Sequence, residues 1–236
     1  MNKIGVIAAL PVEARCLYPE TIPQNRSVDL GHGVSLRVAG VGQENARQAA
    51  NAFIGDQVSL LVSWGVAAAL VDDAATGSLV LADRVIGDSG RVFEVRPEIL
   101  GTLKLFADKA SLETVTGSLA ECHEILTGQE DKQRLHGKTG AVAADMESAA
   151  IASAATQAGL PFLCVRAISD DVNTDIPPSV SVNMRPSGNI NLAGLLKSLV
   201  MKPSDLRELV RLARAFKRAR GTLIQCAGYF KARPGK

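Results

Sequence analysis

Apolar and polar positions follow two alternating patterns along the chain. Short runs rich in Val, Ile, Leu and Ala predict strands at residues 3–9, 34–39, 59–63, 78–86, 91–95, 115–119, 141–144 and 162–168. Helices are expected at residues 46–53, 97–109, 129–135 and 145–157, with two more near the end of the chain. This alternation predicts an α/β fold of three αβα layers around a central twisted, mixed and mainly parallel sheet, open at its edges.

The composition is consistent with one α/β domain over residues 1–200. The chain is 47% hydrophobic but only 4% aromatic, so small aliphatic side chains must fill the core. No apolar run approaches the roughly 20 residues of a membrane span, and the first residues lack a leader pattern, so we expect a cytoplasmic protein. Neither the four cysteines nor the three histidines have metal-ligand spacing, and no metal or organic cofactor is implied.

Carboxylates follow three of the predicted strands. Glu13 comes shortly after the first strand, Asp145 and Glu147 open the predicted helix at 145–157, and Asp170 and Asp171 come directly after the strand at 162–168. Each alone has an ordinary explanation, since acidic residues favour a first helical turn and Asp is common after strands. Because ligands bind at the carboxyl ends of strands in such sheets, the three positions together predict a site for acid–base chemistry.

The sequence around these carboxylates resembles a known family. Residues 4–13, Ile-Gly-Val-Ile-Ala-Ala-Leu-Pro-Val-Glu, are similar to the opening of the methylthioadenosine/adenosylhomocysteine nucleosidases. Residues 145–148, Asp-Met-Glu-Ser, resemble their Glu-Met-Glu segment, and residues 165–170, Val-Arg-Ala-Ile-Ser-Asp, resemble their purine-site strand. Segments 41–46 and 63–65 fall between them in the expected order. The chain therefore resembles the purine nucleoside phosphorylase/nucleosidase superfamily over about residues 3–200.

The resemblance implies catalytic roles for the matching residues. Asp170, oriented by Ser169, corresponds to the residue that protonates or hydrogen-bonds purine N7 and makes adenine a better leaving group. Glu147 corresponds to the carboxylate that accepts hydrogen bonds from the ribose hydroxyls, and Met146 packs against the ribose. Glu13 corresponds to the carboxylate that holds and activates the attacking water. These groups supply leaving-group protonation, charge stabilisation and a positioned nucleophile.

Further substrate contacts are implied at five positions. The backbone around Ile125 is expected to face adenine, and Asp145, Gly65 and Val66 are expected to line the substrate site. His123 stands near the place of an aromatic residue that stacks on the base in the family. Base stacking and an ordinary exposed loop histidine remain equal alternatives for His123.

The departures from the family concern the nucleophile. Phosphate-using members carry an arginine and, three residues later, a serine after the third strand, where this chain has Ser63 and Val66. Water is therefore the expected nucleophile, with Arg15 left as an alternative phosphate ligand. Val66 also replaces a serine of the hydrolytic members, which leaves the placement of the water open.

The segment 201–236 is expected to form a basic helical extension on or beside the domain. It holds ten Lys and Arg against two Asp and Glu, whereas the preceding residues hold sixteen against twenty-two. Arg207, Arg211, Arg214 and Arg218 share one helix face, opposite a mostly apolar one. The basic face is either solvated or a peripheral contact with an anionic membrane.

The Asp-Met-Glu-Ser variant and this tail resemble the phosphorylase-like proteins of bacterial hopanoid biosynthesis. That resemblance implies release of adenine from adenosylhopane, a lipid-linked adenine nucleoside, to leave ribosylhopane. The alternatives are a soluble methylthioadenosine/adenosylhomocysteine nucleosidase, a purine nucleoside phosphorylase and a non-catalytic nucleotide-binding or membrane-adaptor protein. The family resemblance also implies a homo-oligomer, with a dimer favoured. A nucleic-acid partner is not expected, because the basic tail lacks interleaved aromatic residues.

Overall fold

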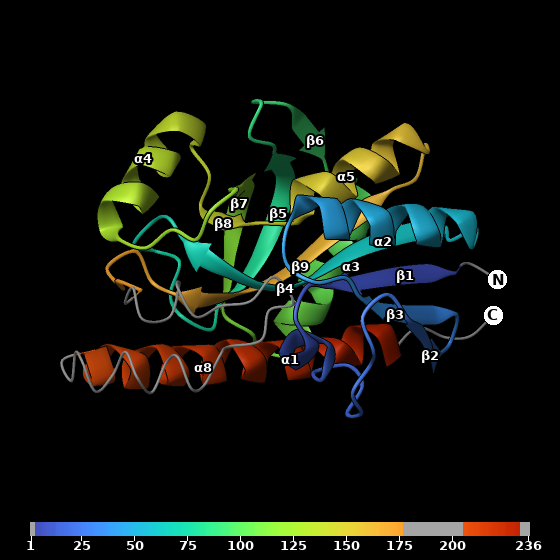
Figure 1. Ribbon diagram of the computed structural model, residues 1–236, viewed down its shortest axis with the longest axis horizontal. Helices are drawn as coiled ribbons and strands as arrows, with labels where there is room; N and C mark the ends of the chain where they lie inside the picture. The colour runs from blue at the N-terminus through green and yellow to red at the C-terminus, as the bar shows by residue number, and fades with distance from the viewer. Residues whose placement is uncertain (1–2, 177–204, 232–236) are drawn as a thin grey trace.

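Strands gathered into one sheet form the centre of the molecule, and helices cover both of its faces (Figure 1). The computed structural model describes residues 3–176 and 205–231. Over these residues the sheet has nine strands: β1 (Ile4–Ala8), β2 (Ser27–Gly31), β3 (Val34–Val38), β4 (Leu60–Ala69), β5 (Leu79–Ile86), β6 (Val92–Glu94), β7 (Thr114–Glu121), β8 (Ala143–Asp145) and β9 (Phe162–Asp170). The predicted α/β class with a mixed sheet is confirmed. β2 was not predicted, because it is a half-exposed edge strand with few apolar residues.

Five of the strands close a ring, so the sheet is not open as the alternation of elements predicted. β4 pairs with β9, β9 with β5, β5 with β7, β7 with β8, and β8 returns to β4. The closure depends on the length of β4. Residues Leu60–Trp64 pair with β1, and Ala68 and Ala69 continue beyond the end of β1 and pair with β8. β1, β3 and β2 extend the sheet outward from β4.

Helices pack on the sheet in two groups, seen above and below it in Figure 1. α2 (Gln43–Gly55) and α5 (Ser148–Gln157) contact each other on one face, and α3 (Pro97–Lys109) and α8 (Asp205–Lys231) contact each other on the other. α1 (Pro11–Ala14) is a single turn after β1, and α4 (Gln129–Thr139) follows β7. The bounds of α3 are those predicted, since Pro97 suits a first helical position.

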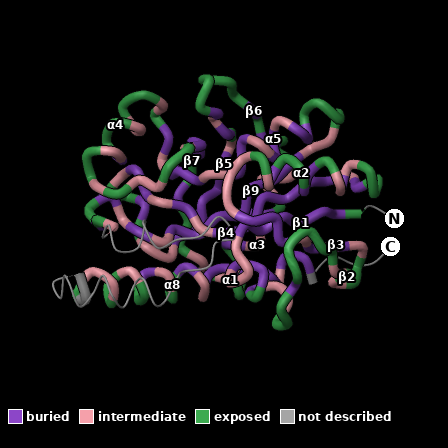
Figure 2. The backbone as a smooth tube through the Cα atoms, viewed as in Figure 1, coloured by how far each residue is buried: buried purple, intermediate pink, exposed green. Residues whose placement is uncertain are grey.

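The core is built from small aliphatic side chains, and Figure 2 shows the central strands buried and the exposed residues on the outer loops and helix faces. α8 packs against β9 and contributes Ala219, Leu223 and Cys226 to this core. Near its end, the ring of Phe230 meets the ring of buried Trp64 edge-on, with centroids 5.8 Å apart.

The outer face of α8 carries four of its arginines. Arg207, Arg211, Arg214 and Arg218 are all exposed, as expected for one helix face. The opposite face was expected to be mostly apolar and buried, yet Val210 (42% exposed) and Ala213 on it are exposed. Among the described side chains of this helix, the buried stripe begins at Ala215. The helix expected around residues 192–199 lies outside the described residues.

Candidate active site

The junction between β8 and α5 places two carboxylates in the interior. Asp145 ends β8, where it lies beside Glu121 of β7 in the parallel register, and Glu147 is the residue that precedes α5. The prediction that Asp145 opens the helix is therefore wrong. The alanine-rich pattern extends back into β8, so the sequence does not show where the strand ends and the helix begins. In the structure the side chain of Asp145 instead caps α5, because it accepts from the backbone N–H of Ser148 at 3.2 Å.

Arg166, in the middle of β9, is the buried cation around which this cluster forms. Its guanidinium Nη2 lies 2.6 Å from Asp145 Oδ2 and 4.0 Å from Glu147 Oε2, and also donates to Ser63 Oγ at 2.6 Å. Burial by itself lowers the pKa of Arg166, but Asp145, Glu147 and Glu13 together raise it, so the guanidinium stays charged.

Glu13 lies on α1 and is held by backbone donors. Its Oε1 accepts from the N–H of Val66 at 2.9 Å, and its Oε2 accepts from the N–H of Leu10 at 2.8 Å. Burial raises the pKa of Glu13, while Arg166 and the two backbone donors oppose this shift. A carboxylate fixed in this way can hold a water molecule and accept its proton.

Gly65 provides the space for this arrangement. A Cβ atom at this position would overlap both the carboxylate of Glu13 and the guanidinium of Arg166. Gly65 therefore lies against both the carboxylate of Glu13 and the guanidinium of Arg166, at a position where only glycine fits.

Glu147 is fixed on the opposite side by the turn before α2. Its Oε1 accepts from the backbone N–H of Gly42 at 2.8 Å. Burial raises the pKa of Glu147 to about 7, with Arg166 lowering it and Asp145 raising it. A buried carboxyl group whose pKa lies near neutrality favours its charged form when a cationic ligand binds beside it.

Asp170 ends β9 and is held through both oxygens. Ser169 Oγ donates to Oδ1 at 2.8 Å, and the buried ammonium of Lys132 donates to Oδ2 at 2.6 Å. In the register of β4 and β9, Asp170 lies opposite Ala68, which also pairs with Ala144 just before Asp145. The ring of strands thus brings Asp170 and Asp145 to the same edge.

A cavity of about 170 Å³ opens at this edge. Glu13, Glu147, Asp170, Ser169 and Asp145 supply its polar groups. Apolar and small side chains line the remainder: Ala9, Leu10, Val41, Val66, Ala67, Ala68, Cys122, Ile125, Leu126, Ala144, Met146 and Ile176. Eight of the ten predicted site residues therefore line one cavity.

Two predicted residues and the alternative phosphate ligand lie elsewhere. Gly65 does not line the cavity but lies directly behind Glu13 and Arg166. His123 is exposed in a neighbouring cleft, where its ring nitrogens lie 2.8 Å from Asp88 Oδ2 and 2.9 Å from Gln43 Nε2. Arg15 is also exposed and donates to Thr21 Oγ1.

Sequence reasoning missed the two buried cations. Arg166 lies within the matching segment 165–170 without a predicted role, although an arginine inside an otherwise apolar strand is a signal that a buried anion lies beside it. Lys132 gave no such signal, because it stands in a strongly polar helix segment. Together they face four cavity-lining carboxylates, so the site carries a surplus of acidic groups over basic ones.

Within residues 3–176 and 205–231, no helix is long and apolar enough to cross a membrane. The same residues contain no group of three or more His, Cys, Asp or Glu side chains arranged to hold a metal ion.

The chain is similar to proteins whose names refer to nucleosidases. A 5′-methylthioadenosine/S-adenosylhomocysteine nucleosidase from Mycobacterium bovis is 27% identical over 222 residues, which cover 73% of this chain and 87% of that protein. The protein of the same name from Shewanella loihica is 24% identical over 229 residues, covering 84% of this chain and 100% of its own.

Solved structures share the fold. The nucleosidase of that name from Neisseria meningitidis, in complex with methylthio-immucillin-A, has a TM-score of 0.73 at 17% identity and covers 98% of this chain and 99% of its own. Futalosine hydrolase of Helicobacter pylori strain 26695 has a TM-score of 0.69 at 16% identity, covering 98% and 96%.

The sequence model of the phosphorylase superfamily matches residues 3–200, which include every residue that lines the cavity. The chain therefore belongs to the phosphorylase superfamily.

Proposed function

We propose that this protein is a purine nucleosidase, which hydrolyses the N-glycosidic bond of an adenosine substituted at its 5′ position. The observation that carries the proposal is the convergence of Glu13, Glu147 and Asp170 on one cavity at the carboxyl ends of the strands. The three carboxylates come from different elements, and separate donors fix each of them. Relatives that bear nucleosidase names support the same assignment.

Each group has a defined task in this reaction. As the C1′–N9 bond breaks, its electron pair moves into the purine, and Asp170 delivers a proton to N7. The ribosyl group becomes cationic at C1′, and the acidic surplus of the site, with Glu147 nearest the ribose hydroxyls, stabilises that charge. Water held by Glu13 adds to C1′, and Glu13 takes its proton.

The electrostatics favour water over phosphate as nucleophile. Arg166 is the buried guanidinium nearest to Glu13 within the described residues, and Asp145 already neutralises it at 2.6 Å. Phosphate would have to approach three carboxylates without a free cationic partner, which is unfavourable. Arg15 does not supply one, because it is exposed and bound to Thr21.

The apolar lining supports a hydrophobic 5′-substituent, and within that class we propose adenosylhopane. The exposed arginines of α8 provide a surface for an anionic membrane that holds such a substrate. The names of the sequence relatives favour methylthioadenosine or adenosylhomocysteine instead. We further propose a homodimer, which light scattering tests directly.

The test is adenine release from methylthioadenosine and from adenosylhopane in detergent, each with and without phosphate. Asp170→Asn should abolish release, whereas Asp108→Asn, which removes an exposed carboxylate on α3, should leave it unchanged. Turnover of adenosylhopane alone supports the lipid-linked substrate, and turnover of methylthioadenosine alone rejects it. Strict phosphate dependence rejects hydrolysis, and unaltered activity in Asp170→Asn rejects the assigned site.

A further inference from the structure

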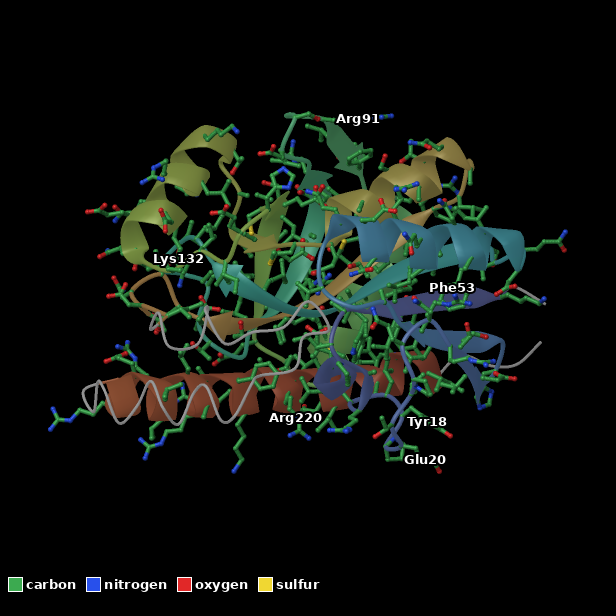
Figure 3. All side chains as sticks on the ribbon, in the orientation of Figure 1. Tyr18, Glu20, Phe53, Arg91, Lys132 and Arg220 are labelled. Carbon is green, nitrogen blue, oxygen red and sulfur yellow. The ribbon has the colours of Figure 1, made fainter. Side chains whose placement is uncertain are left out.

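Lys132 is a buried cation that the proposed reaction has not yet used. It is the buried residue of α4 and lies beneath that helix, toward the sheet (Figure 3). Its ammonium donates to Asp170 Oδ2 at 2.6 Å, to the carbonyl of Asp171 at 2.6 Å and to the carbonyl of Thr174 at 3.0 Å. All three protons of the ammonium are therefore directed at the segment that carries Asp170.

Burying the side chain of Lys132 costs free energy, which its contacts with the Asp170 segment must offset. Its side chain is 0% exposed, and a buried lysine loses its hydration while its long stem is fixed. The two backbone acceptors hold the ammonium whatever the protonation state of Asp170. The amine therefore stays beside the carboxylate throughout a reaction cycle.

The pair resolves a chemical difficulty in the proposed reaction. Asp170 must give a proton to N7, yet its Oδ2 already accepts a hydrogen bond from the positively charged ammonium of Lys132, 2.6 Å away. A pair that holds one proton meets both conditions, since the proton can lie on nitrogen in the free enzyme and on oxygen at the moment of transfer.

We propose that Lys132 is a positioning residue that stores the proton Asp170 delivers to the leaving purine. The inference rests on the proposed nucleosidase function. As the C1′–N9 bond breaks, one proton moves from the Lys132 ammonium to Asp170 and from Asp170 to N7. Lys132 is left as a neutral amine. After adenine leaves, Glu13 releases to solvent the proton that it took from the attacking water, and solvent returns one proton to Lys132.

Other charged groups around the pair do not replace this proton. The carboxylate of Asp171 is directed toward Arg211 of α8, 3.6 Å away. Burial raises the pKa of the Cys122 thiol to about 12, so it stays neutral beside Asp170. Among the described residues, the other charged side chains that line the cavity are Glu13, Asp145 and Glu147, and with Arg166 behind them they form the separate cluster described above.

The pH profile of Lys132→Met tests the proposal. In the wild type, kcat/KM for adenine release should persist into the alkaline range, because an amine holds the proton. In the variant the proton must lie on Asp170 alone, so kcat/KM should begin to fall at a lower pH than in the wild type and then drop about tenfold per pH unit. The deficit should therefore reach about 100-fold two pH units above the point where the variant begins to fall, and shrink as the solution is acidified. A purely structural role would lower kcat/KM by the same factor at every pH and would overturn the proposal.

A second substrate distinguishes a loss of proton delivery from a structural disturbance of the active site by the substitution. The ribosides of 4-nitrophenol have a leaving group that departs without protonation, so Lys132→Met should cleave them at nearly the wild-type rate. Equal losses on both substrates would overturn the proposal.

The wild type alone provides a test if the variant does not fold. A kcat/KM for adenine release that already collapses in the acidic range would show that no amine stores the proton. If the wild type releases no adenine from any nucleoside, the proposed function itself fails. Wild-type turnover with parallel pH profiles for enzyme and variant rejects only the role of Lys132.

Discussion

Replacing Arg166 by methionine should strongly destabilise the fold, because the substitution leaves three buried carboxylates without a cationic partner. Methionine keeps most of the length and apolar volume of the side chain, so the main change is the loss of charge. Asp145, Glu147 and Glu13 then face one another in the interior. The double variant Arg166→Met/Asp145→Asn removes one of these charges and retains an oxygen that can cap Ser148.

The expected loss follows from the distances. At an effective dielectric constant of about 20, a single pair at the 4.0 Å separation of Arg166 and Glu147 interacts by about 4 kcal/mol, and the 2.6 Å contact with Asp145 by more. The desolvation of Arg166 offsets part of this energy. Removing one member of a buried pair costs about 3–5 kcal/mol in net stability, and we expect that loss at neutral pH. The double variant should recover more than half of it.

The loss should depend on pH with a definite sign. Without Arg166, the pKa values of Glu13 and Glu147, which burial already raises, rise further. The folded state then binds protons that the unfolded state has released, so the stability of the variant falls as pH rises through this window. The deficit should be smallest at mildly acidic pH and largest above neutrality.

Urea unfolding followed by circular dichroism over this pH range measures the effect. Arg84→Met is the matched control, since Arg84 pairs with Asp83 at the surface and should contribute less than about 1 kcal/mol. A loss below about 1 kcal/mol for Arg166→Met at neutral pH, or a loss that does not change with pH, would refute the electrostatic account of the cluster.

Three further substitutions test other parts of the structure. Gly65→Ala should displace the carboxylate of Glu13 and reduce kcat for adenine release at least about tenfold, measured by steady-state kinetics at saturating substrate. Glu121→Gln should flatten the pH dependence of stability. Burial raises the pKa of Glu121 to about 7, so the wild type should lose up to about 3 kcal/mol between pH 4.5 and neutrality, less where solvent screens the charge. Phe230→Ala should cost about 3–5 kcal/mol in urea unfolding, because it empties the space beside Trp64.

Each of these expectations has an outcome that contradicts it. Normal turnover by Gly65→Ala would mean that the backbone at this position moves without cost to the site. A pH dependence in Glu121→Gln as steep as that of the wild type would assign the titration to another group. A loss below about 1 kcal/mol for Phe230→Ala would show that the end of α8 is not part of the cooperative core.

The strand-end carboxylates could be predicted because parallel pairing leaves local signals. A buried strand followed by an acidic residue is visible at Glu13 and Asp170, and the topology of α/β sheets then brings such residues together. The eight predicted residues that line the cavity were found in this way or from the family resemblance. His123 was ambiguous from the start, because its partners Gln43 and Asp88 are 80 and 35 residues away in sequence.

What could not be predicted depends on contacts between distant segments. Nothing near Lys132 in the sequence indicates that α4 turns this residue toward Asp170, 38 residues away. The ring of strands was hidden for a similar reason. Ala68 and Ala69 continue β4 past the end of β1, and small residues at a strand end carry no information about which neighbour they will pair with.

The contact between Trp64 and Phe230 has a consequence for synthesis on the ribosome. The indole Nε1 of Trp64 donates to the backbone carbonyl of Glu13, 51 residues earlier, while its ring packs against Phe230, near the end of α8. A growing chain therefore makes Glu13, the carboxylate proposed to hold the attacking water, among its first residues but lacks the last support for it until α8 has been translated. Nascent chains should remain inactive, and in need of protection from aggregation, until that helix emerges from the exit tunnel.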